Sequence, residues 1–291
     1  MRPLRVLVTG APGMLATALR ERLGREHLTA MTSRRDLDIT DSAAVRAMLS
    51  AFRPDTVINC AAMSNVDACE RDPETARRIN GEAPGLLAAL CAEHDAELIH
   101  ISTDYVFEGT KGAPYVEDDP VQPVNHYGES KLRGEEAVAS AVARHKILRV
   151  SMLYGVARTN FADFVASCIE QGKPVKAVID NAGSPTHCPD IAEQIAALLG
   201  RPETGIFHCA GLGGCSRLEF AEHIRALWPA PGLVIEPVRQ ADFPHMLAKR
   251  PENTSLECRR LREAGILRIK PWRDALADYL ADRGRRARGP H

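Results

Sequence analysis

Tyr127 and Lys131 are two residues of this sequence whose types and spacing suggest chemistry. They stand four positions apart in a segment with a helical pattern, so both side chains would lie on one face, a turn apart. An ammonium near a phenol favours the phenolate and lowers the pKa of the phenol, so the hydroxyl can exchange a proton with a substrate oxygen. Taken alone, this spacing is typical of a surface helix.

Thr103 strengthens the chemical interpretation. It follows a strand-like segment at 97–102, and parallel sheets bind their ligands beyond the carboxyl ends of the strands. A hydroxyl at that edge can hold a carbonyl oxygen beside Tyr127, and Lys131 can also hold the ribose of a nicotinamide cofactor. Together, Thr103, Tyr127 and Lys131 predict hydride transfer between such a cofactor and a carbonyl.

Gly10 and Gly13 belong to the segment Gly10-Ala-Pro-Gly13-Met14-Leu15-Ala16, which follows a short β-branched strand at 5–9. The first glycine allows the turn, the second allows the backbone to approach a pyrophosphate, and Ala16 keeps helix and strand close. The helix N-terminus that follows attracts phosphates. The alternative is a tight strand–helix turn without a ligand, but the position after a first strand favours dinucleotide binding.

Ser33, Arg34 and Arg35 follow a second predicted strand at 28–32, where the sequence selects between dinucleotides. A carboxylate there would bind the ribose 2′-hydroxyl of NAD(H), whereas arginine suits a 2′-phosphate. No carboxylate occurs in this stretch before Asp36, and a guanidinium can pair bidentately with phosphate. The sequence therefore favours NADP(H), with NAD(H) also admitted. The alternative is that both arginines are solvated loop charges.

Strand-like and helix-like segments alternate through the first half of the chain. The patterns predict helices at 14–23, 42–52, 75–93 and 127–143, and further strands at 56–61, 97–102 and 146–150. This alternation is typical of an α/β fold, a doubly wound parallel sheet of the Rossmann type. We expect a cofactor-binding domain at 1–150 and a smaller C-terminal substrate-binding lobe at 151–291, with some later segments packing back on the first domain.

The composition excludes several classes of function. Lys and Arg total 37 and Asp and Glu 38, so a net charge of -1 creates no field that attracts nucleic acid or an anionic membrane. No apolar run is long enough to cross a bilayer, and the start leads directly into a strand, so we expect a cytoplasmic protein. The eight cysteines include no Cys-x-x-Cys pair, which predicts reduced thiols and no metal site.

Ordered matches to one family run along nearly the whole chain. They comprise Val8-Thr9-Gly10, Asp36 to Asp41, Pro54 to Ala62, Val66 to Glu70, Ser102 to Gly109, Tyr127 to Lys131 with Gly134-Glu135, Asn160-Phe161, Gly183 to Thr186, and Arg250 to Leu256. On these residues the chain resembles the extended short-chain dehydrogenases/reductases, most closely those of the dTDP-4-dehydrorhamnose reductase type. The resemblance implies NAD(P)H-dependent reduction of the 4-keto group of a deoxynucleoside-diphosphate sugar.

The resemblance also implies roles for individual residues. Catalysis falls to Thr103, Tyr127 and Lys131. The cofactor would be bound by Gly10, Gly13, Met14, Leu15, Ser33, Arg34, Arg35, Asp38, Ile39, Ala61, Ala62, Tyr127 and Lys131. The nucleotide-sugar substrate would be bound by Val66, Asp104, Tyr105, Met152, Asn160, Arg250 and Asn253. We expect Arg250 to hold the diphosphate.

Two positions depart from the family pattern. The family often has a tryptophan, on which a sugar can stack, where this chain has Met152, and methionine does not offer that face. Some relatives bind magnesium between subunits through a glutamate where this chain has Ala18, so no such metal is expected. The exact sugar, the stereochemistry of the alcohol and the oligomeric state stay open, and a homodimer is compatible with the resemblance.

Two other functions are compatible with the sequence. Other extended-family enzymes epimerise or dehydrate nucleotide sugars, but they tend to retain NAD, and the absence of a carboxylate before Asp36 argues mildly against them. A regulatory subunit resembling the β subunit of methionine adenosyltransferase keeps the tyrosine and lysine and also lacks the tryptophan. Assays with 4-keto nucleotide sugars, or copurification with a synthetase, would separate these functions.

Overall fold

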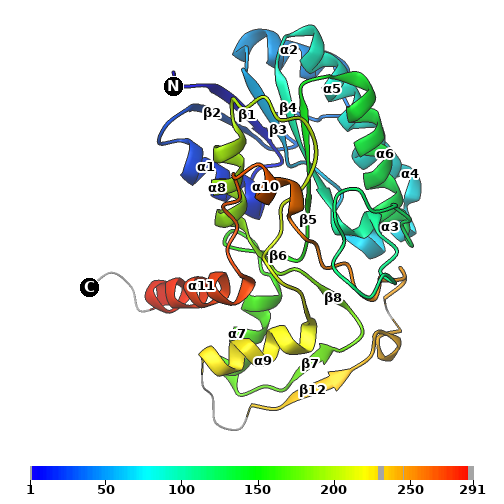
Figure 1. Ribbon diagram of the computed structural model, residues 1–291, viewed down its shortest axis with the longest axis vertical. Coiled ribbons are helices and arrows are strands. Elements are labelled where there is room, and N and C mark those ends of the chain that lie inside the picture. Colours follow the sequence, from blue (N-terminus) through cyan, green and yellow to red (C-terminus); the bar gives the residue numbers. More distant parts are fainter. Residues whose placement is uncertain (1, 229–232, 245, 288–291) are drawn as a thin grey trace.

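The structure is a computed structural model that describes residues 2–228, 233–244 and 246–287 (Figure 1). Its central sheet is parallel, with the strand order β2-β1-β3-β4-β5-β10. The strands are β1 (Arg5–Thr9), β2 (Leu28–Thr32), β3 (Thr56–Asn59), β4 (Glu97–Thr103), β5 (His145–Val150) and β10 (Gly205–His208). The direction in which the chain adds strands reverses between β1 and β3. Sheets of this kind bind ligands beyond the carboxyl ends of the strands at the point of reversal.

Alternate residues of the strands pack against helices on opposite faces of the sheet. On one face, Leu7 and Val57 join a core with α2 (Ser42–Phe52), α5 (Ala83–Glu93) and α6 (His126–Ala141). On the other face, Val8 and Ile58 join a core with α1 (Met14–Leu23) and α8 (Cys188–Leu198). Helices cover both faces, as Figure 1 shows, so the predicted α/β fold of the Rossmann type is confirmed.

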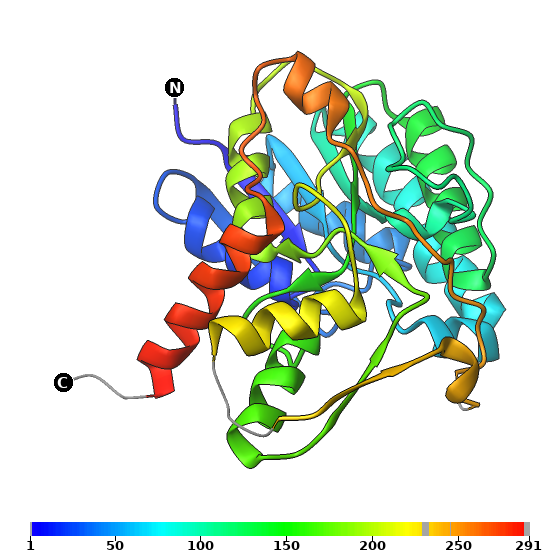
Figure 2. The ribbon, with the colours of Figure 1, turned by 60° about the horizontal axis from the view of Figure 1, so that its bottom comes forward.

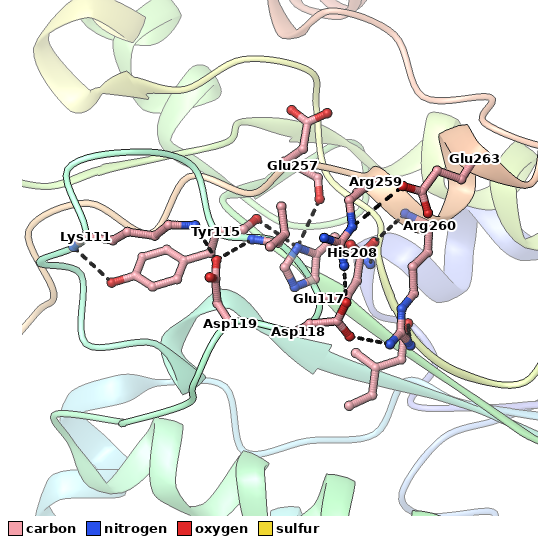
Figure 3. A network of polar contacts seen from close by, with 12 residues as sticks. Lys111, Tyr115, Glu117, Asp118, Asp119, His208, Glu257, Arg259, Arg260 and Glu263 are labelled. Carbon is pink, nitrogen blue, oxygen red and sulfur yellow. Dashed lines mark hydrogen bonds and ion pairs between the residues drawn. The ribbon is translucent and has the colours of Figure 1, made fainter.

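The second half of the chain contributes to this sheet. β10 pairs in parallel with β5, where His208 lies opposite Arg149, and α8 packs on α1. The Nδ1 atom of His208 faces the carbonyl oxygens of Tyr115 and Glu257, each at 3.1 Å, and donates to them (Figure 3). Its backbone N–H donates to the buried carboxylate of Glu117. These contacts join β10 to two loops that are distant from it in the sequence. One loop comes earlier in the chain, and the other leads into α10 (Arg259–Glu263).

A smaller lobe occupies the lower part of Figure 1 and comes forward in Figure 2. Its apolar core includes Phe220 and Trp272. The lobe contains α7 (Phe161–Gln171), α9 (Arg217–Leu227), α11 (Trp272–Ala287) and the parallel pair β7 (Val175–Val178) and β12 (Ile235–Val238). Two short pairs join β6 (Leu153–Tyr154) to β9 (Thr186–His187), and β8 (Ala182–Gly183) to β11 (Cys215–Ser216).

The helix predicted at 75–93 is confirmed as a helical stretch, but it is not α-helical throughout. It consists of α4 (Pro73–Ala76), a π-helical turn (Arg77–Glu82) and α5, and it is preceded by α3 (Val66–Arg71), which the pattern did not predict. Pro84 has no N–H to donate to the carbonyl of Asn80, so the α-helical hydrogen bond between these two positions cannot form. The side chain of Asn80 in the wide turn bonds both the N–H and the carbonyl of Met63, at 2.8 and 3.0 Å, and so fixes the segment after β3.

Within the described ranges, no helix is both long enough and apolar enough to span a membrane. The same residues contain no group of three or more His, Cys, Asp or Glu side chains arranged to hold a metal ion. All eight cysteines are free thiols; Cys60 is partly exposed and the other seven are buried.

Candidate active site at the carboxyl edge of the sheet

A cavity of about 540 Å³ opens beyond β1, β3 and β4, where the chain order of the sheet reverses. It brings together most of the residues predicted to bind a dinucleotide. Its lining includes Gly10, Gly13, Met14, Leu15, Arg34, Asp38, Ile39, Ala61, Ala62, Tyr127 and Lys131. Ser33 and Arg35 are outside the lining, whereas Arg158, from the loop between β6 and α7, was not predicted and belongs to it.

Gly10 and Gly13 shape the cavity wall at the start of α1. Gly10 has a φ of +83°, and a Cβ there would lie 2.6 Å from the carbonyl carbon of Cys60, so no other residue fits. Gly13 caps α1 without a side-chain hydrogen bond, and the first turn contains no acidic residue. The first N–H groups of α1 are therefore available to an anion. This chemistry fits a dinucleotide whose pyrophosphate contacts the helix start.

The segment after β2 has its own hydrogen bonds. Both the N–H and the hydroxyl of Ser33 donate to Asp36, at 2.9 and 2.6 Å. Arg34 is 75% exposed and pairs with Asp38 at 3.4 Å, whereas no ion pair of Arg35 occurs in the described chain. An exposed pair of this length is weak, so the Arg34 guanidinium can turn to a stronger anion.

Tyr127 and Lys131 are held by the first turns of α6. The side chain of Asn125 caps this helix by accepting from the Gly128 N–H at 2.8 Å and donates to the carbonyl of Lys249 at 2.8 Å. Thr103 ends β4, and its hydroxyl forms a hydrogen bond with Tyr127. The Lys131 ammonium is buried and donates to the carbonyl of Ile101 at 2.6 Å. The helix and the strand end thus bring the three predicted catalytic side chains together.

The electrostatics differ from the sequence-based expectation that Lys131 lowers the pKa of Tyr127. Burial raises the pKa of Tyr127 above its ordinary value, and the hydrogen bond with Thr103 opposes this rise. Burial lowers the pKa of Lys131 to about 8. For both groups desolvation, which disfavours the charged form, is the largest effect on the pKa. Tyr127 therefore keeps its proton, which suits a proton donor.

His100 and Asn59 form a buried layer behind Lys131 that the sequence reading missed. The Nε2 atom of His100 lies 3.4 Å from the Lys131 ammonium, and its Nδ1 lies 3.2 Å from the Asn59 amide nitrogen. The Asn59 oxygen accepts from the hydroxyl of Thr9 at 2.7 Å. Burial holds the pKa of His100 well below its ordinary value, so the imidazole is neutral. Both residues lie within apolar strands, where their types alone do not indicate a role in the site.

Asp104 and Tyr105 follow Thr103 in a 3₁₀ turn (Asp104–Val106). Asp104 is buried, and its carboxylate accepts from the hydroxyls of Ser151, at 2.7 Å, and Thr254. Its side chain thus joins three distant segments and does not line the 540 Å³ cavity. The ring of Tyr105, in contrast, lies edge-on to that of Tyr127, with 5.8 Å between the centroids.

The other predicted substrate residues do not line that cavity. Val66 begins α3, and Met152 adopts a φ of 43° just before β6. Asn160 caps α7, accepting from the Asp163 N–H at 3.1 Å. The Asn253 N–H donates to the Gly109 carbonyl at 3.1 Å.

Arg250, predicted to hold a diphosphate, is paired within the chain. Its two terminal nitrogens donate to the two carboxylate oxygens of Asp67, each at 2.8 Å. One of them also donates to the carbonyl of Ala248 at 2.7 Å. The guanidinium lowers the pKa of Asp67 to about 2. The pair fixes the 247–250 segment against α3.

Comparisons with known proteins agree over nearly the full length. The family described as RmlD substrate binding domain matches residues 4–284. The spore coat polysaccharide biosynthesis protein SpsK of Bacillus subtilis is 37% identical, covering 96% of this chain and 98% of that protein. The dTDP-4-dehydrorhamnose reductase of Mycolicibacterium smegmatis is 38% identical, with 95% and 85% covered. The structure of a dTDP-4-dehydrorhamnose reductase from Bacillus anthracis, in complex with NADP, has a TM-score of 0.92 and 31% identity, with 96% and 99% covered.

Proposed function

The chain belongs to the RmlD substrate-binding-domain family, and we propose on this basis that it reduces the 4-keto group of a dTDP-sugar with NADPH. The observation that carries the proposal is the cavity that joins the glycine turn, Arg34, Tyr127 and Lys131. Relatives named as 4-keto reductases of dTDP-sugars match the chain over most of its length, and the Bacillus anthracis relative binds NADP.

The chain's own residues bind the cofactor and move one proton. The first turn of α1 would bind the pyrophosphate, Arg34 the 2′-phosphate and Lys131 the nicotinamide ribose. The bound reduced nicotinamide supplies a hydride to the carbonyl carbon. Thr103 orients the carbonyl oxygen, and Tyr127 donates its proton to that oxygen as the C–H bond forms, which gives the alcohol. The Lys131 charge stabilises the phenolate left on Tyr127.

An assay of NADPH oxidation tests the proposal. The purified protein is mixed with NADPH and either dTDP-4-dehydrorhamnose or dTDP-4-keto-6-deoxy-D-glucose, and the product alcohol is identified. We expect turnover with at least one of these sugars and none with the free keto-sugar that lacks its nucleotide. A protein that binds NADPH but oxidises it with no 4-keto nucleotide sugar, and that copurifies with a synthetase, would have the regulatory function instead. The homodimer and the cytoplasmic location stay predictions.

A further inference from the structure

Arg217 is a cation that the sequence reading did not assign to any site. It is the first residue of α9, directly after β11. β11 pairs with β8, and the Arg217 N–H donates to the carbonyl of Asn181 at 3.3 Å. The Asn181 amide in turn donates to the carbonyl of Pro251 at 2.9 Å. The sheet pairing therefore places Arg217 beside the segment that follows Arg250.

The Arg217 guanidinium lacks a carboxylate partner. It is partly buried and lies over the ring of Phe161, 5.3 Å from the centroid. Among the residues that the structure describes, no Asp or Glu oxygen is within 4.0 Å of it. Burial of a charge that is not fully paired is unfavourable, so such a group is expected to have an anionic partner.

The neighbouring Arg250, in contrast, has a carboxylate partner. Asp67 already neutralises it through two hydrogen bonds of 2.8 Å, and this pair also joins two elements of the fold. A diphosphate that approached Arg250 would have to break those bonds or accept the repulsion of the Asp67 carboxylate. The buried Asp104 attracts the Arg217 guanidinium only from beyond ion-pair distance, so Arg217 is the more favourable of the two arginines for an anion.

Tyr105 connects the surroundings of Arg217 to the proton donor. Its ring packs edge-on against Tyr127, and its hydroxyl forms a hydrogen bond with the side chain of Asn181. The carbonyl of Asn181 accepts from the Arg217 N–H at 3.3 Å, so Tyr105 links Tyr127 to the segment that carries Arg217. In a pyranose, C4 and C1 are at opposite ends of the ring. A sugar with its C4 oxygen at Tyr127 that extends past Tyr105 would direct its C1 substituent toward Arg217.

We propose that Arg217 is the binding residue for the diphosphate of the substrate, and that Arg250 serves to fix the 247–250 segment. This inference rests on the proposed function. A guanidinium suits the role because it is always charged and offers paired donors to phosphate oxygens.

Calorimetric titration of the NADPH-loaded protein with dTDP and with thymidine tests the assignment. Arg217→Met keeps an aliphatic stem against Phe161 and removes the charge. We expect it to weaken dTDP binding about 10- to 100-fold, the range for a hydrogen bond to a charged group, and to leave thymidine binding unchanged. The dTDP affinity of Arg217→Lys should lie between those of Arg217→Met and the wild type. Arg225→Met, an exposed arginine on the same helix, is the matched control and should bind dTDP normally.

The outcomes separate this inference from the proposed function. If Arg217→Met binds dTDP as the wild type does, while the wild type reduces a dTDP-4-keto sugar, only the Arg217 assignment is overturned. If the wild type oxidises NADPH with no such sugar, the proposed function fails as well. Should Arg217→Met not fold, Arg217→Gln takes its place: a lower ratio of dTDP to thymidine affinity than in the wild type supports the assignment, and an unchanged ratio overturns it.

Discussion

Tyr127 is protonated at neutral pH because its burial disfavours the phenolate, and its hydrogen bond with Thr103 positions the hydroxyl. We expect Tyr127→Phe to lower kcat about 10²- to 10⁴-fold, the usual contribution of a positioned general acid. The affinity for NADPH should be nearly unchanged, because the ring still fills the same space. Steady-state kinetics with a 4-keto dTDP-sugar and fluorescence titration with NADPH measure the two quantities. Wild-type turnover in this variant, with chemistry rate-limiting, would exclude Tyr127 as the donor.

Lys131 gives a pH dependence whose sign can be worked out. Its pKa is lowered from 10.5 to about 8, so below pH 8 it is charged in both states and the folded protein bears the full cost of burial. Between pH 8 and 10.5 the folded state releases its proton first, so the unfolded state binds more protons and the free energy of unfolding rises. The shift corresponds to about 3 kcal/mol.

Comparison of the cofactor-free wild type with Lys131→Met measures this effect. Urea titrations across that pH range should show the wild type gaining stability relative to the variant. The difference between the two proteins is the relevant quantity, because burial raises the pKa of several cysteine thiols, such as Cys91, and their titration acts in the opposite direction. A constant difference between wild type and variant would mean that Lys131 is not desolvated as the structure indicates.

Arg34 determines the expected preference for NADPH over NADH. It is the only residue of the Ser33-Arg34-Arg35 segment in the cavity lining, and its pair with Asp38 is exposed. Arg34→Ala should weaken NADPH binding about 10- to 100-fold and leave NADH binding nearly unchanged. Arg35→Ala is the matched control, with a smaller effect expected. Calorimetry with both dinucleotides measures the preference, and equal losses for the two would show that Arg34 does not contact the 2′-phosphate.

Some site residues could be predicted from the sequence because their arrangement depends only on neighbouring residues. The spacing of Tyr127 and Lys131 on one helix, and of Gly10 and Gly13 in one turn, is set by short-range geometry. His100 and Arg217 could not be found this way, because their roles depend on side chains far away in the sequence. The same holds for Asp104, because its carboxylate accepts hydrogen bonds from Ser151 and Thr254, which are distant in the sequence.

At the scale of elements, a buried ion pair joins α6 to β5. The Glu135 carboxylate accepts from two nitrogens of Arg149, the shorter contact being 2.7 Å, and from the hydroxyl of Ser102 on β4. Both charged side chains are 3% exposed. We expect Glu135→Gln to lower the free energy of unfolding by about 3–5 kcal/mol, because Arg149 would remain buried without a counter-charge.

An exposed pair of similar length provides the control for this prediction. Lys270 and Asp278 lie 2.6 Å apart but are 51% and 60% exposed. Asp278→Asn should change stability by about 0–1 kcal/mol. Equal effects of Glu135→Gln and Asp278→Asn in urea titrations would contradict the importance of burial for the first pair.

The patterns predicted elements well where the helix or strand depends on its own residues. The structure confirms the predicted helices at 14–23 and 42–52 and the strands at 5–9 and 28–32. The helix at 75–93 contains a π-helical turn that the pattern did not indicate, because Pro84 interrupts the α-helical hydrogen bonding and Asn80 bonds Met63 across a loop. The periodicity of apolar residues does not indicate either effect.

At the scale of the whole molecule, the chain passes between the sheet and the lobe several times. After β5 it enters the lobe with β6 and α7, returns to the sheet with α8 and β10, and leaves again for α9. The segment 258–269 returns once more, because Cys258, Leu261 and Ile269 pack in the core that holds α1. The lobe is therefore continuous in space but built from separate stretches of sequence.

This path determines how the sugar preference of the protein could be re-engineered. A hybrid made by joining residues 1–150 to the second half of a relative would replace not only the lobe but also α8, which covers the sheet, and β10, which completes it. Without a matched β10, β5 would become an open edge with unpaired N–H and carbonyl groups, and such edges promote aggregation. A graft confined to the lobe therefore needs several separate donor segments, with the α8–β10 stretch retained from the host.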